Sequence, residues 1–130
     1  MTTLRSSTAS RYPEPVSEAK PQIDVDAFVA VDMRVGRVLE VRPFPEARKP
    51  AWQLHVDFGP ELGTRWTSAQ VTNDAADELV GRRVVGAVNL GTRRIAGFVS
   101  EFLLLGAVQP DGTVVLLDVD ETADLGAPIA

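Results

Sequence analysis

Hydrophobic and polar residues alternate along much of the chain, and this pattern predicts β-strands. In Trp52–Phe58 the apolar residues recur at every second position, which is the spacing of one face of a strand. A short helix is expected at Ala75–Val80, capped by Asn73 or Asp74 and ended by Gly81. Turn residues between the alternating segments divide them into six expected strands: Met33–Phe44, Trp52–Phe58, Thr64–Val71, Arg82–Leu90, Val99–Val108 and Thr113–Val119.

The order of these elements is typical of a small barrel. Three strands, a helix and two further strands are the order expected of an OB-fold, a five-stranded Greek-key barrel. Gly36, near the start of the first strand, is expected to mark the bend at which the barrel closes. We therefore predict an all-β fold with one short helix, to which an extra C-terminal strand and a tail are added.

One domain is expected, because 130 residues suffice for one hydrophobic core and not for two. Residues 1–25 are rich in Ser, Thr and Pro without a hydrophobic period, which predicts a disordered leader. The domain then spans 26–130, and its C-terminal extension, 108–130, includes the hairpin turn Gln109–Gly112. Such an extension either covers a sheet edge or pairs across a two-fold axis, and we favour the second. Three apolar residues before the first strand are expected to be buried: Phe28, Val29 and Val31.

The locally basic stretches of the sequence are expected to end at the rim of the barrel. An OB-fold binds ligands on the face of strands two and three and with the loops that join strands one to two and four to five. Those loops are expected at Pro43–Ala51 and Gly91–Phe98. Two locally basic stretches, Arg34–Lys49 and Arg82–Arg94, end in these loops, which indicates a binding surface there.

Strand three supplies candidate binding side chains. Alternation places Trp66, Ser68 and Gln70 on one face, which we expect to point outward. Trp66 offers a flat ring for stacking, and the other two offer hydrogen-bond donors and acceptors. In the alternative, Trp66 packs in the core and the polar pair is merely solvated. The opposite face carries small or mostly apolar residues expected in the core: Thr67, Ala69 and Val71.

Other polar residues near the rim are candidates with simpler alternatives. Arg93 and Arg94 are adjacent, so one of them is expected to face the groove and bind a carboxylate or phosphate, unless both are merely solvated. Asn89 ends an apolar run, where its amide either contacts a ligand or holds the loop in shape. Asp32 and Arg34 share a strand face and are expected to pair.

The composition argues against catalysis. The chain has no cysteine and one histidine, His55, which excludes zinc clusters and thiol nucleophiles. His55 alternates onto the polar face of its strand, where we expect a solvated side chain rather than a catalytic base. No glycine-rich phosphate-binding motif occurs. We therefore expect no enzymatic activity and no cofactor.

The sequence also predicts a cytoplasmic location. No apolar run approaches the roughly 18–20 residues needed to span a bilayer, and the N-terminal segment lacks the apolar middle of a secretory signal. We expect no membrane insertion. The net charge is −5, but the barrel itself is neutral and can carry a basic stripe. The excess acidic residues all follow Ala107: Asp111, Asp118, Asp120, Glu121 and Asp124.

Several ordered motifs resemble those of one known family. They are Phe28…Asp32-x-Arg34-x-Gly36, Ser68-Ala69-Gln70-Val71-Thr72, Val88-Asn89-Leu90 and Arg93-Arg94-Ile95-Ala96-Gly97-Phe98-x-Ser100-Glu101. Together they resemble the tRNA-binding-domain family over residues 26–130. The loop Phe44–Ala51 and the segment Asp57–Gly59 are similar to the CsaA-like secretion chaperones within that family.

The resemblance implies an OB-fold, a homodimer and no enzymatic activity. CsaA-like proteins are thought to hold unfolded precursor proteins and deliver them to the export ATPase SecA, whereas other family members bind tRNA by its shape. Two positions depart from the family pattern: Gly91-Thr92 replaces an expected proline pair, and Trp66 replaces an expected polar residue. By matching motif, the implied groove residues are Ser68, Gln70, Asn89, Arg93, Arg94, Ser100 and Glu101, with Arg34 and Lys49 nearby.

Two functions remain open, and the sequence favours the first. A peptide-holding chaperone needs exposed apolar surface beside polar and cationic groups, for which the candidates are Phe44, Trp52, Trp66 and Phe98, although Trp52 alternates toward the core. Binding of tRNA needs a basic stripe and weakens steeply with salt. The acidic pI of about 4.8 and the presence of only two lysines, Lys20 and Lys49, make tRNA the alternative ligand.

Overall fold

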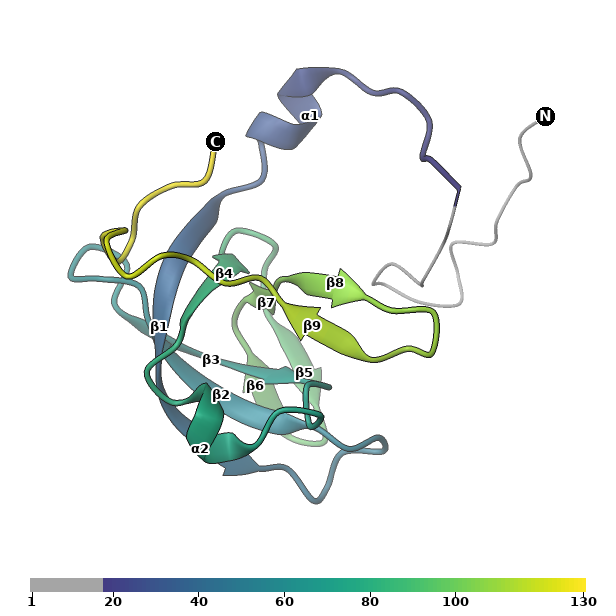
Figure 1. Cartoon of the computed structure of the whole chain (residues 1–130), viewed down its shortest axis with the longest axis vertical. Helices are drawn as coiled ribbons and strands as arrows, with labels where there is room; N and C mark the ends of the chain where they lie inside the picture. The colour runs from purple at the N-terminus through teal and green to yellow at the C-terminus, as the bar shows by residue number, and fades with distance from the viewer. Residues whose placement is uncertain (1–17) are drawn as a thin grey trace.

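Five antiparallel strands form the main sheet of the protein in the order β3-β2-β1-β4-β7 (Figure 1). The computed structural model describes residues 18–130, so most of the predicted leader lies outside the described residues. The first four strands confirm the predicted ones, with ends displaced by a few residues. The bounds are Met33–Pro43 (β1), Trp52–Asp57 (β2), Thr64–Ala69 (β3), Arg83–Ala87 (β4) and Leu103–Leu104 (β7).

The sheet closes on itself because its edges are joined. β1 is long enough to pair with β4 through its first half and with β2 through its second half. At the far edge, the backbone N–H of Glu101 donates to the carbonyl of Trp66 at 2.7 Å. The hydroxyl of Thr67 donates to the carbonyl of Phe102, also at 2.7 Å. The result is a nearly closed five-stranded antiparallel barrel, which confirms the predicted OB-fold.

The barrel interior is filled by apolar side chains from alternate strand positions. Gly36 lies where β1 passes closest to them, since a Cβ at this position would lie 2.5 Å from Cγ1 of Val56 and 2.8 Å from the ring of Phe58. The strand can cross the core here only without a side chain. The apolar core residues that are at most 2% exposed are Val35, Val38, Leu54, Val56, Phe58, Val71, Leu79, Val84 and Ala87.

The predicted helix is present as α2, Ala76–Leu79, but its cap differs from the prediction. Neither Asn73 nor Asp74 caps it. Instead, the carboxylate of Glu78 accepts the backbone N–H of Ala75 at 3.4 Å. The side chains of Asn73 and Asp74 contact other parts of the chain, so tertiary contacts have replaced the local capping bond.

The segment after β4 departs most from the prediction. The expected loop Gly91–Phe98 contains a strand, β5 (Arg93–Ile95), which forms a hairpin with the next strand. The chain bends after the β5 hairpin, where the N–H of Glu101 bonds to β3. It bends again before the last hairpin of the chain, where the N–H of Leu105 bonds to β4. The expected single strand Val99–Val108 is therefore divided into shorter ones: β6 (Phe98–Ser100), β7 and β8 (Gly106–Val108).

The C-terminal extension folds back on its own chain. β9 (Val114–Leu116) pairs with β8 across the predicted turn Gln109–Gly112. The tail then runs beside β1, where the N–H of Val35 donates to the carbonyl of Ala127 at 3.0 Å. The tail thus covers an edge of β1 within its own chain, while pairing across a two-fold axis stays a prediction.

The segment before β1 is more exposed than expected. The helix α1, Val25–Val29, contains no buried residue and projects away from the barrel (Figure 1). Phe28 is 46% exposed and Val29 is 70% exposed, so the expectation that both are buried is wrong, while Val31 is half-buried. In the described part of the chain, no helix combines the length and the apolar character needed to cross a membrane.

Replacing Gly36 with Ala is expected to destabilise the barrel by about 1–3 kcal/mol, because the added methyl group overpacks the core. Urea unfolding measures this change in the free energy of unfolding. Val56→Ala removes the nearest of the atoms that the new methyl group meets, although the ring of Phe58 remains. The double variant should therefore lose less stability than the sum of the two single variants, and strictly additive losses would contradict the packing role of Gly36.

Candidate ligand-binding groove

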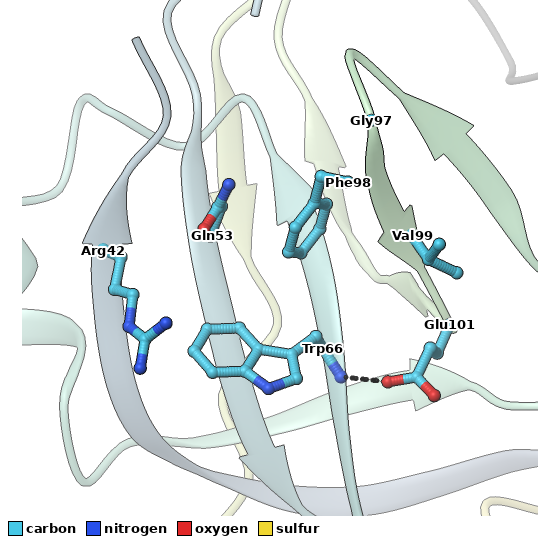
Figure 2. Close-up of a pocket in the computed structure, with 7 residues that line it drawn as sticks. All are labelled: Arg42, Gln53, Trp66, Gly97, Phe98, Val99 and Glu101. Atoms are coloured by element: carbon cyan, nitrogen blue, oxygen red, sulfur yellow. Dashed lines mark hydrogen bonds between the residues drawn. The ribbon is translucent and has the colours of Figure 1, made fainter. Parts of the chain in front are cut away.

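A groove of about 600 Å³ lies between the outer face of β1, β2 and β3 and the β5–β6 hairpin (Figure 2). It combines aromatic and aliphatic surface with one cation, one anion and one amide. The three strands belong to the barrel, and the hairpin is a separate two-stranded sheet whose β6 packs against β3, so the groove is part of the folded framework. Its lining residues are Arg42, Gln53, Trp66, Gly97, Phe98, Val99 and Glu101.

Trp66 is the largest side chain in the groove. It is half-buried, whereas its neighbour Thr67 is 1% exposed, so the inward and outward alternation predicted for strand three is observed. The Trp66 ring stacks on that of His55, with centroids 4.5 Å apart and planes 5° from parallel. The guanidinium carbon of Arg42 lies 4.6 Å from the Trp66 centroid. These stacking and cation–π contacts hold the indole at the surface, and His55 is a packing partner rather than a simply solvated side chain.

The two predicted rim loops meet at this groove. Phe44, at the start of the β1–β2 loop, packs against Phe98 with ring centroids 5.4 Å apart. Phe98 contacts Trp66 edge-on at 6.3 Å. Phe44 is only 5% exposed, so the expectation that it offers an open apolar contact is wrong, and it anchors the loop instead. Trp52 packs against the core.

The second rim loop is a β-hairpin with a two-residue turn. Ile95 pairs with Phe98, and the turn residues Ala96 and Gly97 have φ values of 48° and 82°. Positive φ at both positions fits a type I′ turn, whose twist matches that of the flanking strands. Glycine adopts this geometry freely, whereas alanine is strained there. The turn brings Phe98 and Val99 back toward the groove.

Glu101 and Ser100 join the hairpin to β3. The carboxylate Oε1 of Glu101 accepts the N–H of Trp66 at 2.9 Å, while the N–H of Glu101 donates to the carbonyl of the same residue. The hydroxyl of Ser100 lies 2.8 Å from that of Thr67, and both are buried. Ser100 therefore closes the barrel from inside and does not line the groove, contrary to the expectation from the resemblance.

Two predicted site residues have structural partners away from the groove. The side-chain carbonyl of Asn89 accepts the N–H of Asp32, and its amide donates to the carbonyl of Ala30, both at 2.8 Å. Arg34 donates to Asp32 at 2.6 Å, as expected, and to the carbonyl of Gly126 at 3.1 Å. The hydrogen bond to Asp32 raises the pKa of Arg34. Asn89 and Arg34 thus fasten the N-terminal segment and the C-terminal tail to the barrel.

The remaining predicted residues lie on β3 and β5, just after β3 and in the β1–β2 loop. Ser68 is half-buried on β3, two residues after Trp66. Arg93 is half-buried on β5, which forms the hairpin wall with β6. Three predicted residues are exposed: Lys49, Gln70 and Arg94. None of these five residues lines the groove itself, so their contribution to binding stays a prediction.

Sequence reasoning missed four lining residues: Arg42, Gln53, Gly97 and Val99. In the observed register Arg42 pairs with Gln53 across β1 and β2, and Gln53 lies opposite Ser68 on β3. Aligning the outward positions of the three strands would have found the first two. That alignment depends on an irregularity in β1 between Val38 and Glu40, which shifts the register and has no local signal in the sequence.

The charges of the groove partly compensate one another. Arg42 donates to Glu40 at 2.6 Å, so its positive charge is already paired. None of the salt bridges formed among residues 18–130 involves Glu101. The described residues also contain no cluster of three or more histidine or acidic side chains that could hold a metal ion. The groove is suited to binding mixed polar and apolar groups.

A five-stranded barrel with an aromatic groove beside these two loops defines a binding domain of the OB-fold class. Residues 33–128 match the family model described as "Putative tRNA binding domain". The chain therefore belongs to the tRNA-binding-domain family, as its motifs indicated.

Two solved structures of CsaA chaperones are similar to this chain. The CsaA chaperone protein from Picrophilus torridus is 41% identical with a TM-score of 0.79, and the match covers 84% of this chain and 100% of that one. The chaperone CsaA from Bacillus anthracis str. Ames is 40% identical with a TM-score of 0.80, and the match covers 85% of this chain and 100% of that one.

A curated relative shows how far the similarity to enzymes extends. The methionine–tRNA ligase of Methanococcus vannielii is 37% identical over 108 residues, which are 82% of this chain. The chain spans only 16% of that ligase. The similarity therefore concerns the tRNA-binding part of the ligase and not its whole length.

Replacing Ala96 with Asn is expected to stabilise the protein by about 0.5–1 kcal/mol, because Asn tolerates positive φ better than Ala. Thermal unfolding should show a higher midpoint. Ala96→Val is the matched control and should lower the midpoint, since a β-branched residue is poorly accommodated at positive φ. A lower midpoint for Ala96→Asn would contradict the turn geometry described for this hairpin.

Proposed function

We propose that this chain is a cytoplasmic, non-catalytic binding protein that holds unfolded segments of precursor proteins for export. The observation that carries the proposal is the groove in which Trp66, Phe98 and Val99 lie beside Arg42 and Glu101. An unfolded polypeptide presents apolar, polar and charged groups together, so a surface of mixed character suits many different segments.

The charge of the groove favours a polypeptide over RNA. The guanidinium group of Arg42 is paired with Glu40, and Glu101 adds a negative charge to the lining. RNA binding draws much of its affinity from cations placed at phosphate groups. A groove with a paired cation and a carboxylate offers little of this attraction, whereas aromatic packing against a polypeptide does not depend on it.

The similarity to CsaA chaperones supports the same proposal, because the match spans the whole of both solved chains. The motifs that resemble CsaA-like proteins make the export ATPase SecA the proposed recipient of a held precursor. In this proposal the protein delivers its ligand unchanged.

A tRNA is the second candidate ligand, and the rim of the groove supports it. The chain belongs to the tRNA-binding-domain family, and the relatives named above include a methionine–tRNA ligase. Arg48, Lys49 and Arg94 are exposed on the two loops that meet at the groove. These cations suit phosphate groups, and Trp66 suits the stacking of an unpaired base.

We further propose that the protein is a homodimer. Apolar side chains before β1 are largely exposed: Ile23 at 69% precedes α1, and Val25 at 67%, Phe28 and Val29 lie within it. Pairing of two copies would cover such side chains. Two grooves on one particle would also allow weak contacts along one unfolded chain to combine.

Competition between labelled tRNA and a labelled unfolded peptide tests the two ligands directly. We expect peptide binding that changes little with salt and weakens by about tenfold in Trp66→Ala, because the indole supplies much of the apolar contact. Fluorescence anisotropy at low and moderate salt measures both affinities. Leu117→Ala, which removes an exposed apolar side chain outside the groove lining, is the matched control and should bind normally.

The same titrations show whether tRNA is the ligand instead of a polypeptide. Salt-sensitive tRNA binding that is lost in the Arg93→Ala, Arg94→Ala double variant would favour the nucleic-acid ligand. Arg37→Ala removes an exposed cation outside the groove lining and controls for a general loss of positive charge. Strong tRNA binding without peptide binding would overturn the proposed chaperone function.

Sedimentation of the purified protein is expected to give about twice the monomer mass of 14.0 kDa. Phe28→Asp should shift the protein toward the monomer, because it places a charge on the exposed apolar surface of α1. Val115→Asp places a charge at an exposed apolar position of β9. Comparing the masses of the two variants shows whether α1 or the C-terminal hairpin forms the dimer interface. A wild-type monomer at micromolar concentration would contradict the proposed dimer.

A further inference from the structure

The side chain of Glu101 has two roles: it helps to close the barrel, and it lines the groove. Its Oε1 atom accepts the backbone N–H of Trp66 at 2.9 Å, and its side chain also lines the groove (Figure 2). No hydrogen bond within residues 18–130 reaches its second carboxylate oxygen, Oε2. A carboxylate that is held by one oxygen keeps acceptor capacity on the other.

We propose that Glu101 determines the specificity of the groove, with Oε1 positioning Trp66 and Oε2 binding the cationic group of a lysine or arginine in the ligand. The proposal rests on the proposed function, in which the ligand is an unfolded polypeptide. The preferred segment carries a basic residue beside an aromatic or large aliphatic one. The apolar side chain packs on Trp66 and Phe98 while the neighbouring cation reaches Glu101.

The arrangement of charge around Trp66 supports this preference. Figure 2 shows Arg42 and Glu101 on opposite sides of the Trp66 indole. Arg42 is paired with Glu40, so its repulsion of a second cation is reduced. At the other side, the Glu101 carboxylate is available to a cation without a competing salt bridge from the described residues. A phosphate group at that side would instead meet a like charge.

The half-buried position of Glu101 favours the binding of a ligand cation by its carboxylate. Its backbone N–H is bound to the carbonyl of Trp66, so the residue is fixed at both its backbone and its carboxylate. A fixed acceptor loses little conformational entropy when a ligand cation binds. Hydrogen bonds to charged groups are also stronger than neutral ones. Glu101 therefore suits selection of a cation more than a mobile surface carboxylate would.

The test uses three labelled unstructured peptides that differ only at one residue beside a central Phe, which is Lys, Gln or Glu. Wild-type protein should bind the Lys peptide about fivefold more tightly than the Gln peptide and the Glu peptide most weakly. Fluorescence anisotropy at constant ionic strength gives the three dissociation constants. The full chain is used throughout.

Glu101→Gln separates the two roles of the side chain. Its amide oxygen can still accept the N–H of Trp66, but the negative charge is gone, so the variant should fold and bind the Lys and Gln peptides with about equal affinity. Glu101→Ala removes both roles and should weaken all three peptides. Glu121→Gln, which removes an exposed carboxylate from the C-terminal tail, is the matched control and should keep the preference.

The outcomes separate this inference from the function on which it rests. Equal binding of the three peptides by wild-type protein, or a Lys preference that survives in Glu101→Gln, would overturn the role of Glu101 and leave a polypeptide ligand in place. Unfolding of Glu101→Gln would overturn the positioning role, because an amide oxygen should suffice for it. Binding of tRNA and of none of the peptides would overturn the proposed function itself.

Discussion

The join between β3 and the segment after β6 is the contact on which the barrel and the groove both depend. Trp66 and Glu101 exchange two hydrogen bonds there, and the buried hydroxyls of Thr67 and Ser100 bond to each other on the core side. The first pair faces the groove and the second faces the core, so one short contact closes the sheet and positions its exposed aromatic ring. A change that opened this join would therefore affect stability and ligand binding together.

Most of the barrel could be predicted because its signals are local. Alternation and turn residues placed β1, β2 and β3 and the turn before β9, since each strand presents one face to the same core. The division of the segment after β4 could not be predicted in this way. Its bends are set by bonds from Glu101 to β3 and from Leu105 to β4, and such partners are distant in the sequence.

The groove was predicted only in part, for two physical reasons. The outward position of Trp66 followed from the alternation of its own strand, whereas Arg42 entered the groove through a register that the irregularity in β1 alters. The motif residues Asn89 and Ser100 were expected at the groove because a motif marks positions without separating structural from binding roles. Both have hydrogen-bond partners within the barrel. A polar residue in a motif must therefore be tested for partners before it is assigned to a ligand.

The indole of Trp66 determines the surroundings of several other side chains. Arg42 lies over its ring, His55 stacks on it and Phe98 meets its edge, so each of these neighbours has an aromatic partner that a polar residue would not provide. The cation of Arg42 is thereby held against the indole and paired with Glu40. An arginine in this position is less available to a phosphate group than a solvated one. The aromatic floor thus suits ligands that bind by packing, and in the alternative with tRNA as the ligand the phosphate groups would meet the exposed cations of the rim.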